Sequence, residues 1–349
     1  MAVTAAARLA ALAPPCAYGE PAAQGALRAT PEDFVVEEDL GFAPAGAGAH
    51  LLLKVRKRAA NTQWVAKALA RIAGCRPMDV GYAGLKDRQA VALQWFSVPR
   101  PRATVAWEGV RTDEFEVLEA HAHNRKLPRG ALAGNRFTLR INALAGSGEQ
   151  LAVRLRDRLA LIGAGGVPNY FGPQRFGRDG ANLERAQHGW AGLRGEERGF
   201  VLSAARSVIF NAVLAARVAD GGWRELRAGD LANLDARGSI FAIPLVDEVL
   251  QGRCTRLEIH PTGPLWGAGE PATSGAVLEL EAQAAAGLAD YSQLCLAARL
   301  EQERRSLRLA VRELTCESQA AAVVLRFRLT RGAFATAVLR ELVAGAAAD

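Results

Sequence analysis

Apolar and polar side chains alternate along several short stretches of the chain, the spacing of two that is typical of strands with one buried face. The clearest case is 136–142, where Phe137, Leu139 and Ile141 share one face and polar residues the other. A similar alternation at 323–329 predicts a strand near the end of the chain. Further strands are predicted at 34–38, 94–98 and 115–120, the last with imperfect alternation.

Other stretches repeat apolar residues at the spacing of a helix. The first begins at Asn61 or Thr62, either of which can cap a helix, and Gly74 ends it. Further helices are predicted at 151–162, 202–218 and 333–342.

The length of the chain and a change in its local composition indicate more than one domain. At roughly 100–200 residues per domain, the 349 residues form about two domains, each able to bury its own core. Between about 167 and 306 glycine is more frequent, and 221–275 has the pattern of loops, so this part is expected to be a separate domain. No repeat of fixed period is present in the sequence, which disfavours a solenoid or a propeller.

The composition is that of a folded protein with a basic surplus. Half of the residues are hydrophobic and 23% are charged, which excludes a disordered chain. Lys and Arg number 43 against 36 Asp and Glu, which gives a net charge of +7 at pH 7. Such a surplus favours a polyanionic partner, although a merely soluble surface explains the charge equally well.

Cofactor and membrane signals are missing from the sequence. The five cysteines and five histidines have no metal-site spacing, and the glycines at 46–48 and 163–166 lack the context of a nucleotide-binding loop. We therefore expect neither a metal nor a small-molecule cofactor. No run of about 20 apolar residues predicts a membrane span, and scattered thiols favour a cytoplasmic protein.

A glycine-bounded turn at 81–90 holds one acid, Asp87, between two bases, Lys86 and Arg88. Either base would favour the ionised form of the acid, which suits a catalytic carboxylate. An ordinary surface ion pair has the same composition, and the residues alone favour that simpler interpretation.

A second stretch, 125–137, gathers four cations with Asn135 and Phe137. Cations for phosphate, an amide for a base edge and a ring for stacking would make an RNA-base pocket. The strand alternation, however, places Phe137 on the core face with Leu139, where packing alone explains the ring.

Residues 84–94 (GLKDRQAVALQ) resemble the catalytic motif of the TruD family of tRNA pseudouridine synthases. Further motifs follow in the order of that family, so the resemblance extends from about 18 to about 342. These motifs are 31–37 (PEDFVVE), 130–132 (GAL), 134–137 (GNRF), 167–177 (VPNYFGPQRFG), 202–207 (LSAARS) and 332–336 (GAFAT).

The resemblance implies an α+β fold. A pseudouridine-synthase catalytic domain with a mixed, largely antiparallel sheet would comprise 1–166 and 307–349. An inserted α/β TRUD-type domain would comprise 167–306, which matches the change of texture along the chain.

It also implies isomerisation of uridine 13 in tRNA to pseudouridine, with Asp87 as the essential carboxylate. The partner would be tRNA, without metal, cofactor or membrane. The sequence leaves the oligomeric state open, and we expect a monomer. The residues that would bind the substrate are Phe34, Lys86, Asn135, Phe137 and Phe334.

The reaction moves uracil from an N1 to a C5 linkage, so the glycosidic bond must break while water is excluded. One carboxylate suffices, either as a nucleophile or as a base on the sugar, and the sequence does not distinguish these routes. The base must also leave its stack at a cost of a few kcal/mol, which stacking worth about 1–3 kcal/mol would largely offset. Ala92, where the family usually has Thr, and Pro128, in a segment often free of proline, depart from the pattern.

Two other interpretations stay open. The protein could bind RNA without turning it over, or Glu32 or Asp33 could be the working acid with Asp87 only structural. Three groups of cations are expected to follow the RNA backbone. They are Lys54, Arg56, Lys57 and Arg58; Arg125, Lys126 and Arg129; and Arg175 and Arg178.

Overall fold

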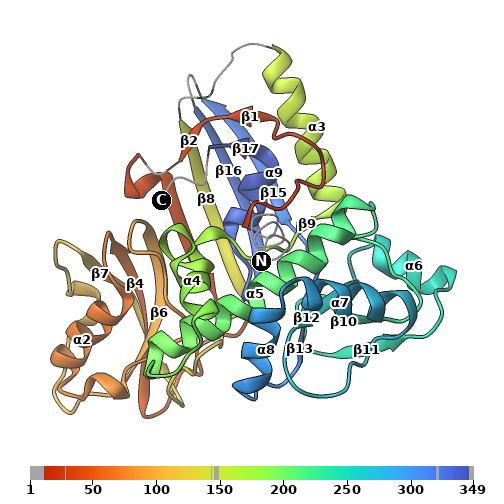
Figure 1. The fold of residues 1–349 in the computed structure, drawn as a ribbon. Coiled ribbons are helices and arrows are strands. Elements are labelled where there is room, and N and C mark those ends of the chain that lie inside the picture. The colour runs from red at the N-terminus through yellow and green to blue at the C-terminus, as the bar shows by residue number, and fades with distance from the viewer. Residues whose placement is uncertain (1–11, 28, 143, 145–148, 320–321, 346–349) are drawn as a thin grey trace. The chain divides into compact units, whose positions relative to one another are not determined.

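The computed structural model describes residues 12–27, 29–142, 144, 149–319 and 322–345, and these residues form two compact units. The sheet unit contains the described residues of 23–151, 312–332 and 343–345. The helical unit contains those of 12–22, 152–311 and 333–342. Each unit is assembled from segments far apart in the sequence, as the colours of Figure 1 show.

This division differs in part from the expected domains, 1–166 with 307–349 and 167–306. Most of α3 (Glu149–Gly165) and all of α9 (Ala335–Leu342) belong to the unit that contains 167–306. Compactness alone does not show which segments form the catalytic and the inserted domain, so the expected boundaries stay a prediction.

A nine-stranded sheet forms the sheet unit, in the order β15-β16-β8-β3-β6-β4-β7, with β2 beside β8 and β5 beside β6. Within the described part of this sheet, β3 and β6 form the single parallel pair, so the expected mixed, largely antiparallel sheet is confirmed. Separately, β1 (Ala23–Gln24) pairs in parallel with β17 (Val343–Ala344). The strands of the large sheet are β2 (Ala26–Leu27), β3 (Phe34–Asp39), β4 (His50–Arg58), β5 (Gly81–Tyr82), β6 (Val91–Pro99), β7 (Phe115–His123), β8 (Gly134–Asn142), β15 (Arg312–Gln319) and β16 (Ala322–Thr330).

One helix, α2 (Thr62–Ala73), packs on this sheet where the sequence predicted it. The Asn61 side chain accepts a hydrogen bond from the backbone N–H of Gln63 at 2.8 Å, which caps the helix. Gly74 ends it in the left-handed conformation, with φ of 65°. The buried face of α2 shares a core cluster with β4 and β6, formed by Val65, Leu69, Leu53, Val55, Phe96 and Val98 among others.

The helical unit is built around α5 (Gly195–Ala219), whose buried residues share a core cluster with α4 and α8. Its four-stranded sheet has the order β11-β10-β12-β13, and β14 pairs with β9. The other helices are α4 (Ala181–Gln187), α6 (Glu248–Thr255), α7 (Gly275–Gly287) and α8 (Ala289–Ala297). The strands are β9 (Val167–Pro168), β10 (Asp230–Leu234), β11 (Ile240–Ile243), β12 (Ile259–Leu265), β13 (Glu303–Ser306) and β14 (Arg308–Leu309).

The prediction that 221–275 consists largely of loops is wrong, because this stretch contains β10, β11, α6 and β12. The sequence of β12, IHPTGPL, contains two prolines and a glycine, which disfavour a central strand. Six of its seven residues are nevertheless buried between neighbouring strands. Tertiary packing here overrides local preference.

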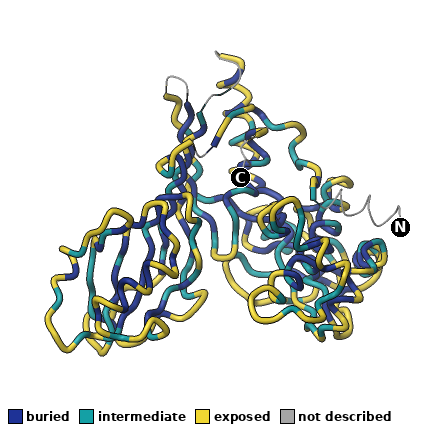
Figure 2. The backbone as a smooth tube through the Cα atoms, turned by 60° about the vertical axis from the view of Figure 1, so that its left-hand side comes forward, coloured by how far each residue is buried: buried dark blue, intermediate teal, exposed yellow. Residues whose placement is uncertain are grey.

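Among the described helices, α5 alone is long and apolar enough to cross a membrane by length and composition. Its side chains Val208, Ile209 and Phe210 are fully buried against Tyr291 and other residues of the helical unit. Its apolar character is that of a core helix. Figure 2 shows the buried positions in dark blue, concentrated along helices and strands, with exposed positions in yellow along the connecting loops.

Candidate active site

Asp87 lies in the loop between β5 and β6, and hydrogen bonds to its side chain and to its backbone help to hold it there. Its carboxylate Oδ1 accepts the backbone N–H of Gln89 at 3.0 Å. Its backbone carbonyl accepts the ammonium of Lys57 at 3.0 Å. The same ammonium donates to the carbonyl of Ala60 at 2.7 Å, so β4 and the start of α2 are tied to the loop.

Lys57 has no solvent exposure, which is unusual for a lysine. Burial lowers the pKa of its ammonium from 10.5 to about 8, and the nearby Lys86 also lowers it. The charges of Asp87 and Glu38 act in the opposite direction and raise this pKa.

The ammonium of Lys86 connects the loop to two strands. It lies 2.9 Å from Oε1 of Glu38 on β3 and donates a hydrogen bond of 2.6 Å to Oδ1 of Asn135 on β8. The backbone N–H of Lys86 donates to Oγ1 of Thr62 at 3.1 Å. Lys86 thus forms an ion pair with Glu38. That Lys86 or Arg88 favours the ionised form of Asp87 stays a prediction.

Glu38 is the centre of a buried polar network. Its Oε2 accepts the backbone N–H of Trp95 at 2.9 Å, and its Oε1 accepts from Nε2 of Gln94 at 3.3 Å. Gln94 also donates to the carbonyl of Gly84 at 2.7 Å and accepts from Oγ1 of Thr62 at 3.0 Å. Since both carboxylate oxygens are satisfied, the network fixes the loop backbone at Gly84 and Lys86.

Strand pairing places Glu38 opposite Asn135, and Val36 opposite Phe137. Along β3 every second residue from Phe34 to Glu38 is buried. Glu38 therefore lies on the buried face of β3. The alternation from Phe34 through Val36 was the signal that Glu38 shares their buried face.

The aromatic residues predicted for the pocket form a cluster in the sheet unit. Phe34 and Phe137 meet edge to face, with ring centroids 6.0 Å apart. Phe137 also stacks on Phe327 of β16 at 5.4 Å. All three rings are buried, so packing accounts for Phe137 as the alternation predicted.

Phe334 belongs to the helical unit, just before α9. Its ring lies 6.4 Å from that of Phe171, and the guanidinium of Arg175 lies 5.7 Å from the Phe334 centroid. The structure thus brings Lys86, the neighbour of Asp87 in the sequence, into contact with Asn135 and brings the rings of Phe34 and Phe137 together. Phe334 belongs to the other unit, the helical one.

The residues of this network that the sequence analysis missed are Glu38, Gln94 and Thr62. Each is a polar residue at a buried position. The alternation on β3 indicates the buried face for Glu38, but the hydrogen bonds that make a buried polar group acceptable are recognisable only when its partners are known. Lys57 was counted among surface cations, whereas it lies under the loop.

The basic run on β4 is largely neutralised by carboxylates. The ammonium of Lys54 lies 3.0 Å from Glu37 and 3.2 Å from Glu119. Arg56 pairs with Glu116 at 3.1 Å and Arg58 with Glu32 at 2.6 Å. This pairing argues against the run as a tRNA-binding face.

The two alternative acids have structural partners. Glu32 pairs with Arg58, and Oδ2 of the buried Asp33 accepts the backbone N–H of Thr30 at 2.9 Å. Among the described residues, no group of three or more His, Cys, Asp or Glu side chains is placed to hold a metal ion.

Comparisons with known proteins identify the family of the chain. The family model described as tRNA pseudouridine synthase D (TruD) matches residues 16–186 and 193–342. The tRNA pseudouridine synthase D of Methylococcus capsulatus is 46% identical over 335 residues, which cover 94% of each chain. That of Chromohalobacter salexigens is 47% identical over 343 residues, covering 94% of this chain and 95% of the relative.

A solved structure shares the fold. The crystal structure of a protein from Methanosarcina mazei, described as a putative tRNA pseudouridine synthase D (TruD), superimposes with a TM-score of 0.68 at 21% identity. The match covers 91% of this chain and 93% of the other. Family model, relatives and fold agree along nearly the whole sequence, and the chain therefore belongs to the TruD family of tRNA pseudouridine synthases.

Proposed function

We propose that this protein converts uridine 13 of tRNA to pseudouridine, with Asp87 as the essential carboxylate. One observation carries the proposal: Lys86, next to Asp87, donates directly to Asn135, so the motif loop is joined to the strand that bears the base-recognising amide. On this proposal tRNA is the partner, and the protein acts as a cytoplasmic monomer without metal or cofactor.

The position of Asp87 suits a single-carboxylate mechanism. Its backbone is held by Lys57, and its carboxylate is oriented by the N–H of Gln89. A carboxylate oriented in this way can attack the sugar or remove a proton from it as uracil leaves, and both routes stay open. Fixing the loop reduces the reorganisation needed when the substrate binds.

Asn135 is suited to recognise uracil because its amide has a defined orientation. The ammonium of Lys86 can only donate, so the Asn135 atom beside it is the carbonyl oxygen. The amide nitrogen then presents N–H donors to a uracil carbonyl. The second lone pair of the amide oxygen can accept the uracil N3–H. Lys86 contributes to binding by fixing this orientation.

Aromatic residues supply the surface for the flipped base. Phe34 and Phe137 lie on the same buried face as Asn135, along β3 and β8. Stacking on one ring would offset much of the cost of unstacking the base. Phe334 is proposed as a substrate residue only because it lies in the family motif at 332–336.

Release of tritium tests the reaction, because label at C5 of uridine leaves only when a bond forms at that carbon. We expect wild-type protein to release tritium from labelled tRNA and Asp87→Asn to release none. No release by the wild type would contradict the isomerase and favour an RNA-binding protein without turnover. Normal release by Asp87→Asn would reject Asp87 and favour another acid, with Glu32→Gln and Asp33→Asn as the next variants.

Position 13 requires its own experiment. A transcript in which uridine 13 alone is replaced by cytidine should release no tritium, and the same replacement at another uridine should leave release unchanged. Continued release from the cytidine 13 transcript would show that another uridine is the target.

A further inference from the structure

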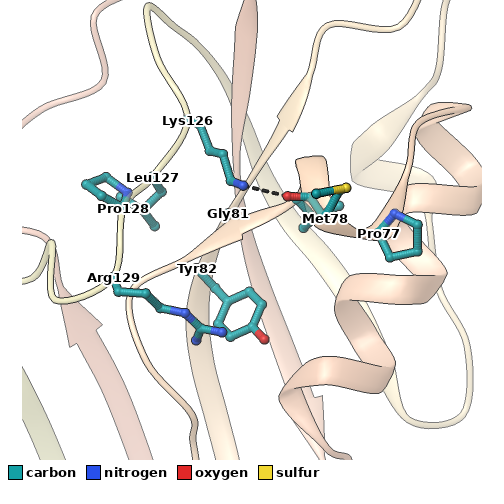
Figure 3. Close-up of a pocket in the computed structure, with 9 residues that line it drawn as sticks. Pro77, Met78, Gly81, Tyr82, Lys126, Leu127, Pro128 and Arg129 are labelled. Carbon is teal, nitrogen blue, oxygen red and sulfur yellow. Dashed lines mark hydrogen bonds between the residues drawn. The ribbon is translucent and has the colours of Figure 1, made fainter. Parts of the chain in front are cut away.

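A pocket of about 430 Å³ lies in the sheet unit, beside β5 and apart from the network around Glu38. One wall is the segment 126–129, and the other runs from the short 3-10 helix Pro77–Asp79 to Tyr82. Figure 3 shows the side chains of Lys126 and Arg129 extending from the first wall towards Met78 and Tyr82 on the second. Its lining residues are Pro77, Met78, Val80, Gly81, Tyr82, Lys126, Leu127, Pro128 and Arg129.

The two walls are fastened together, so the pocket is part of the fold. The backbone N–H of Leu127 donates at 2.7 Å to Oγ of Ser97, the residue of β6 that pairs with Gly81 of β5. Just beyond the two walls, the backbone N–H of Gly130 donates to the carbonyl of Ala83 at 2.7 Å. The ammonium of Lys126 reaches across to the carbonyl of Met78 at 2.5 Å. A Cβ on Gly81 would lie 2.5 Å from the carbonyl oxygen of Leu127, so only glycine allows this close contact.

Arg129 is the group in this pocket that is built to bind an anion. Its guanidinium stacks on the ring of Tyr82 at 3.8 Å, as Figure 3 shows. Over the described part of the chain, no oxygen accepts a hydrogen bond from it and no carboxylate pairs with it. The ring therefore orients a planar cation whose N–H donors are all available, the arrangement that binds phosphate in a bidentate manner.

Other features of the pocket suit a nucleotide. The preceding residue, Pro128, fixes its own backbone φ and stiffens the segment that carries Arg129. Pro77 and the exposed side chain of Met78 provide an apolar surface on the opposite wall. A volume of this size accommodates a small ligand or one unit of a polymer.

Connectivity limits how far the pocket lies from the proposed catalytic residue. Tyr82 and Asp87 are five residues apart, so the chain between them spans at most roughly 18 Å. A few nucleotides of an RNA strand cover that distance. We infer that this pocket binds the backbone phosphate of a tRNA nucleotide that flanks the target uridine, with Arg129 as the phosphate-binding residue.

The inference rests on the proposed function, and binding measurements test it separately from turnover. The probe is a tRNA transcript with cytidine at position 13, which binds without reacting. We expect Arg129→Gln to raise the Kd about 10-fold, the loss of affinity expected when one hydrogen bond from a charged donor is removed. The slope of log Kd against log salt should fall by about 1.

Arg56→Gln is the matched control, because it removes the same charge from the same unit at a site already paired with Glu116. It should change the Kd less than twofold. Arg129→Lys should keep the salt slope of the wild type but not its affinity, because lysine lacks the planar group that stacks on Tyr82.

Neutral phosphates locate the contact. Each transcript in a series carries a single methylphosphonate, which replaces in turn each of the four phosphates on the 5′ side and the four on the 3′ side of the target. One position should weaken wild-type binding about 10-fold and leave the binding of Arg129→Gln within twofold of its value for the unmodified transcript. Equal losses in both proteins at every position would overturn the inference.

The outcomes separate the two proposals. If the wild type releases tritium while Arg129→Gln behaves like Arg56→Gln, the pocket inference is wrong and the proposed function stands. If binding depends on Arg129 but the wild type releases no tritium, the proposed function is wrong and the pocket remains a site for RNA phosphate.

Discussion

The ammonium of Lys86 lies 2.9 Å from Oε1 of Glu38, and the Glu38 side chain has no solvent exposure. A buried carboxylate and a nearly buried ammonium are costly to remove from water, and each compensates the other. The pair joins β3 to the loop that carries Asp87, so it supports the proposed site as well as the core.

Replacing Glu38 by Gln should lower the free energy of unfolding by about 3–5 kcal/mol, because the charge of Lys86 is left buried without its partner. Adding Lys86→Met should recover part of that loss. Urea unfolding of the two single variants and the double variant measures the coupling.

Glu37→Gln is the control for this cycle. Glu37 is the neighbouring residue on β3, but it is partly exposed and pairs with Lys54, so its replacement should cost less than about 1 kcal/mol. If Glu38→Gln cost no more than Glu37→Gln, the buried pair would contribute nothing to stability.

Local patterns predicted most elements of the sheet unit. The strand predicted at 136–142 is β8, and that at 323–329 is β16, each within two residues at its ends. The imperfect alternation at 115–120 also has a cause. On β4, Lys54 pairs with Glu119 but Val55 with Val117, so Leu118 is an extra residue that shifts the register of β7.

Contacts between residues far apart in the sequence could not be predicted from local patterns. Asp87, Lys86 and Asn135 were proposed as site residues from their motifs, and the bond between Lys86 and Asn135 joins residues 49 positions apart. Glu38 was missed because a buried acid looks unfavourable until its cationic partner is known. Strand β12 was missed because its prolines and glycine contradict the structure that packing imposes.

The lowered pKa of Lys57 predicts that the free energy of unfolding depends on pH in a specific range. Its pKa is about 8 in the folded protein against an ordinary value of 10.5, so between these values the unfolded chain binds more protons. This group therefore makes the free energy of unfolding rise with pH from about 8 to 10.5, by at most about 1.4 kcal/mol per pH unit. Below pH 8 its unfavourable contribution is fully present.

The measurement is the difference in unfolding free energy between wild type and Lys57→Met at several pH values. The contributions of other titrating groups are similar in both proteins and largely cancel in the difference. The unfolding free energy of the wild type should therefore increase relative to that of Lys57→Met as the pH rises above 8. Lys67→Met, at an exposed position of α2, should show no such shift. A pH-independent difference for Lys57→Met would mean that Lys57 titrates normally in the folded state.

Asn135→Asp tests the orientation of the amide. The carboxylate still accepts from Lys86, but the N–H donors for uracil are lost. Because the variant also adds a negative charge beside the buried Glu38, its unfolding free energy is measured as well and the rate is compared at a temperature where the variant is folded. We expect kcat/KM for tritium release to fall about 100-fold, because a site built to hydrogen-bond a substrate is left with an unpaired polar group. Asn142→Asp makes the same chemical change at the other end of β8 and should leave the rate unchanged. An Asn135→Asp protein as active as Asn142→Asp would show that the amide does not contact the base.

Phe137 has a packing role in the structure and a substrate role in the proposal, and a pair of variants separates them. Phe137→Leu and Phe327→Leu each remove one ring of the stacked pair, whose centroids are 5.4 Å apart. Each should cost about 1–1.5 kcal/mol of unfolding free energy, because leucine refills most of the space. Stacking on a base contributes about 1–3 kcal/mol, so Phe137→Leu should lower kcat/KM about 10-fold or more, while Phe327→Leu should change it little. Equal losses of activity in the two variants would mean that Phe137 acts only through the packing of β8 against β16.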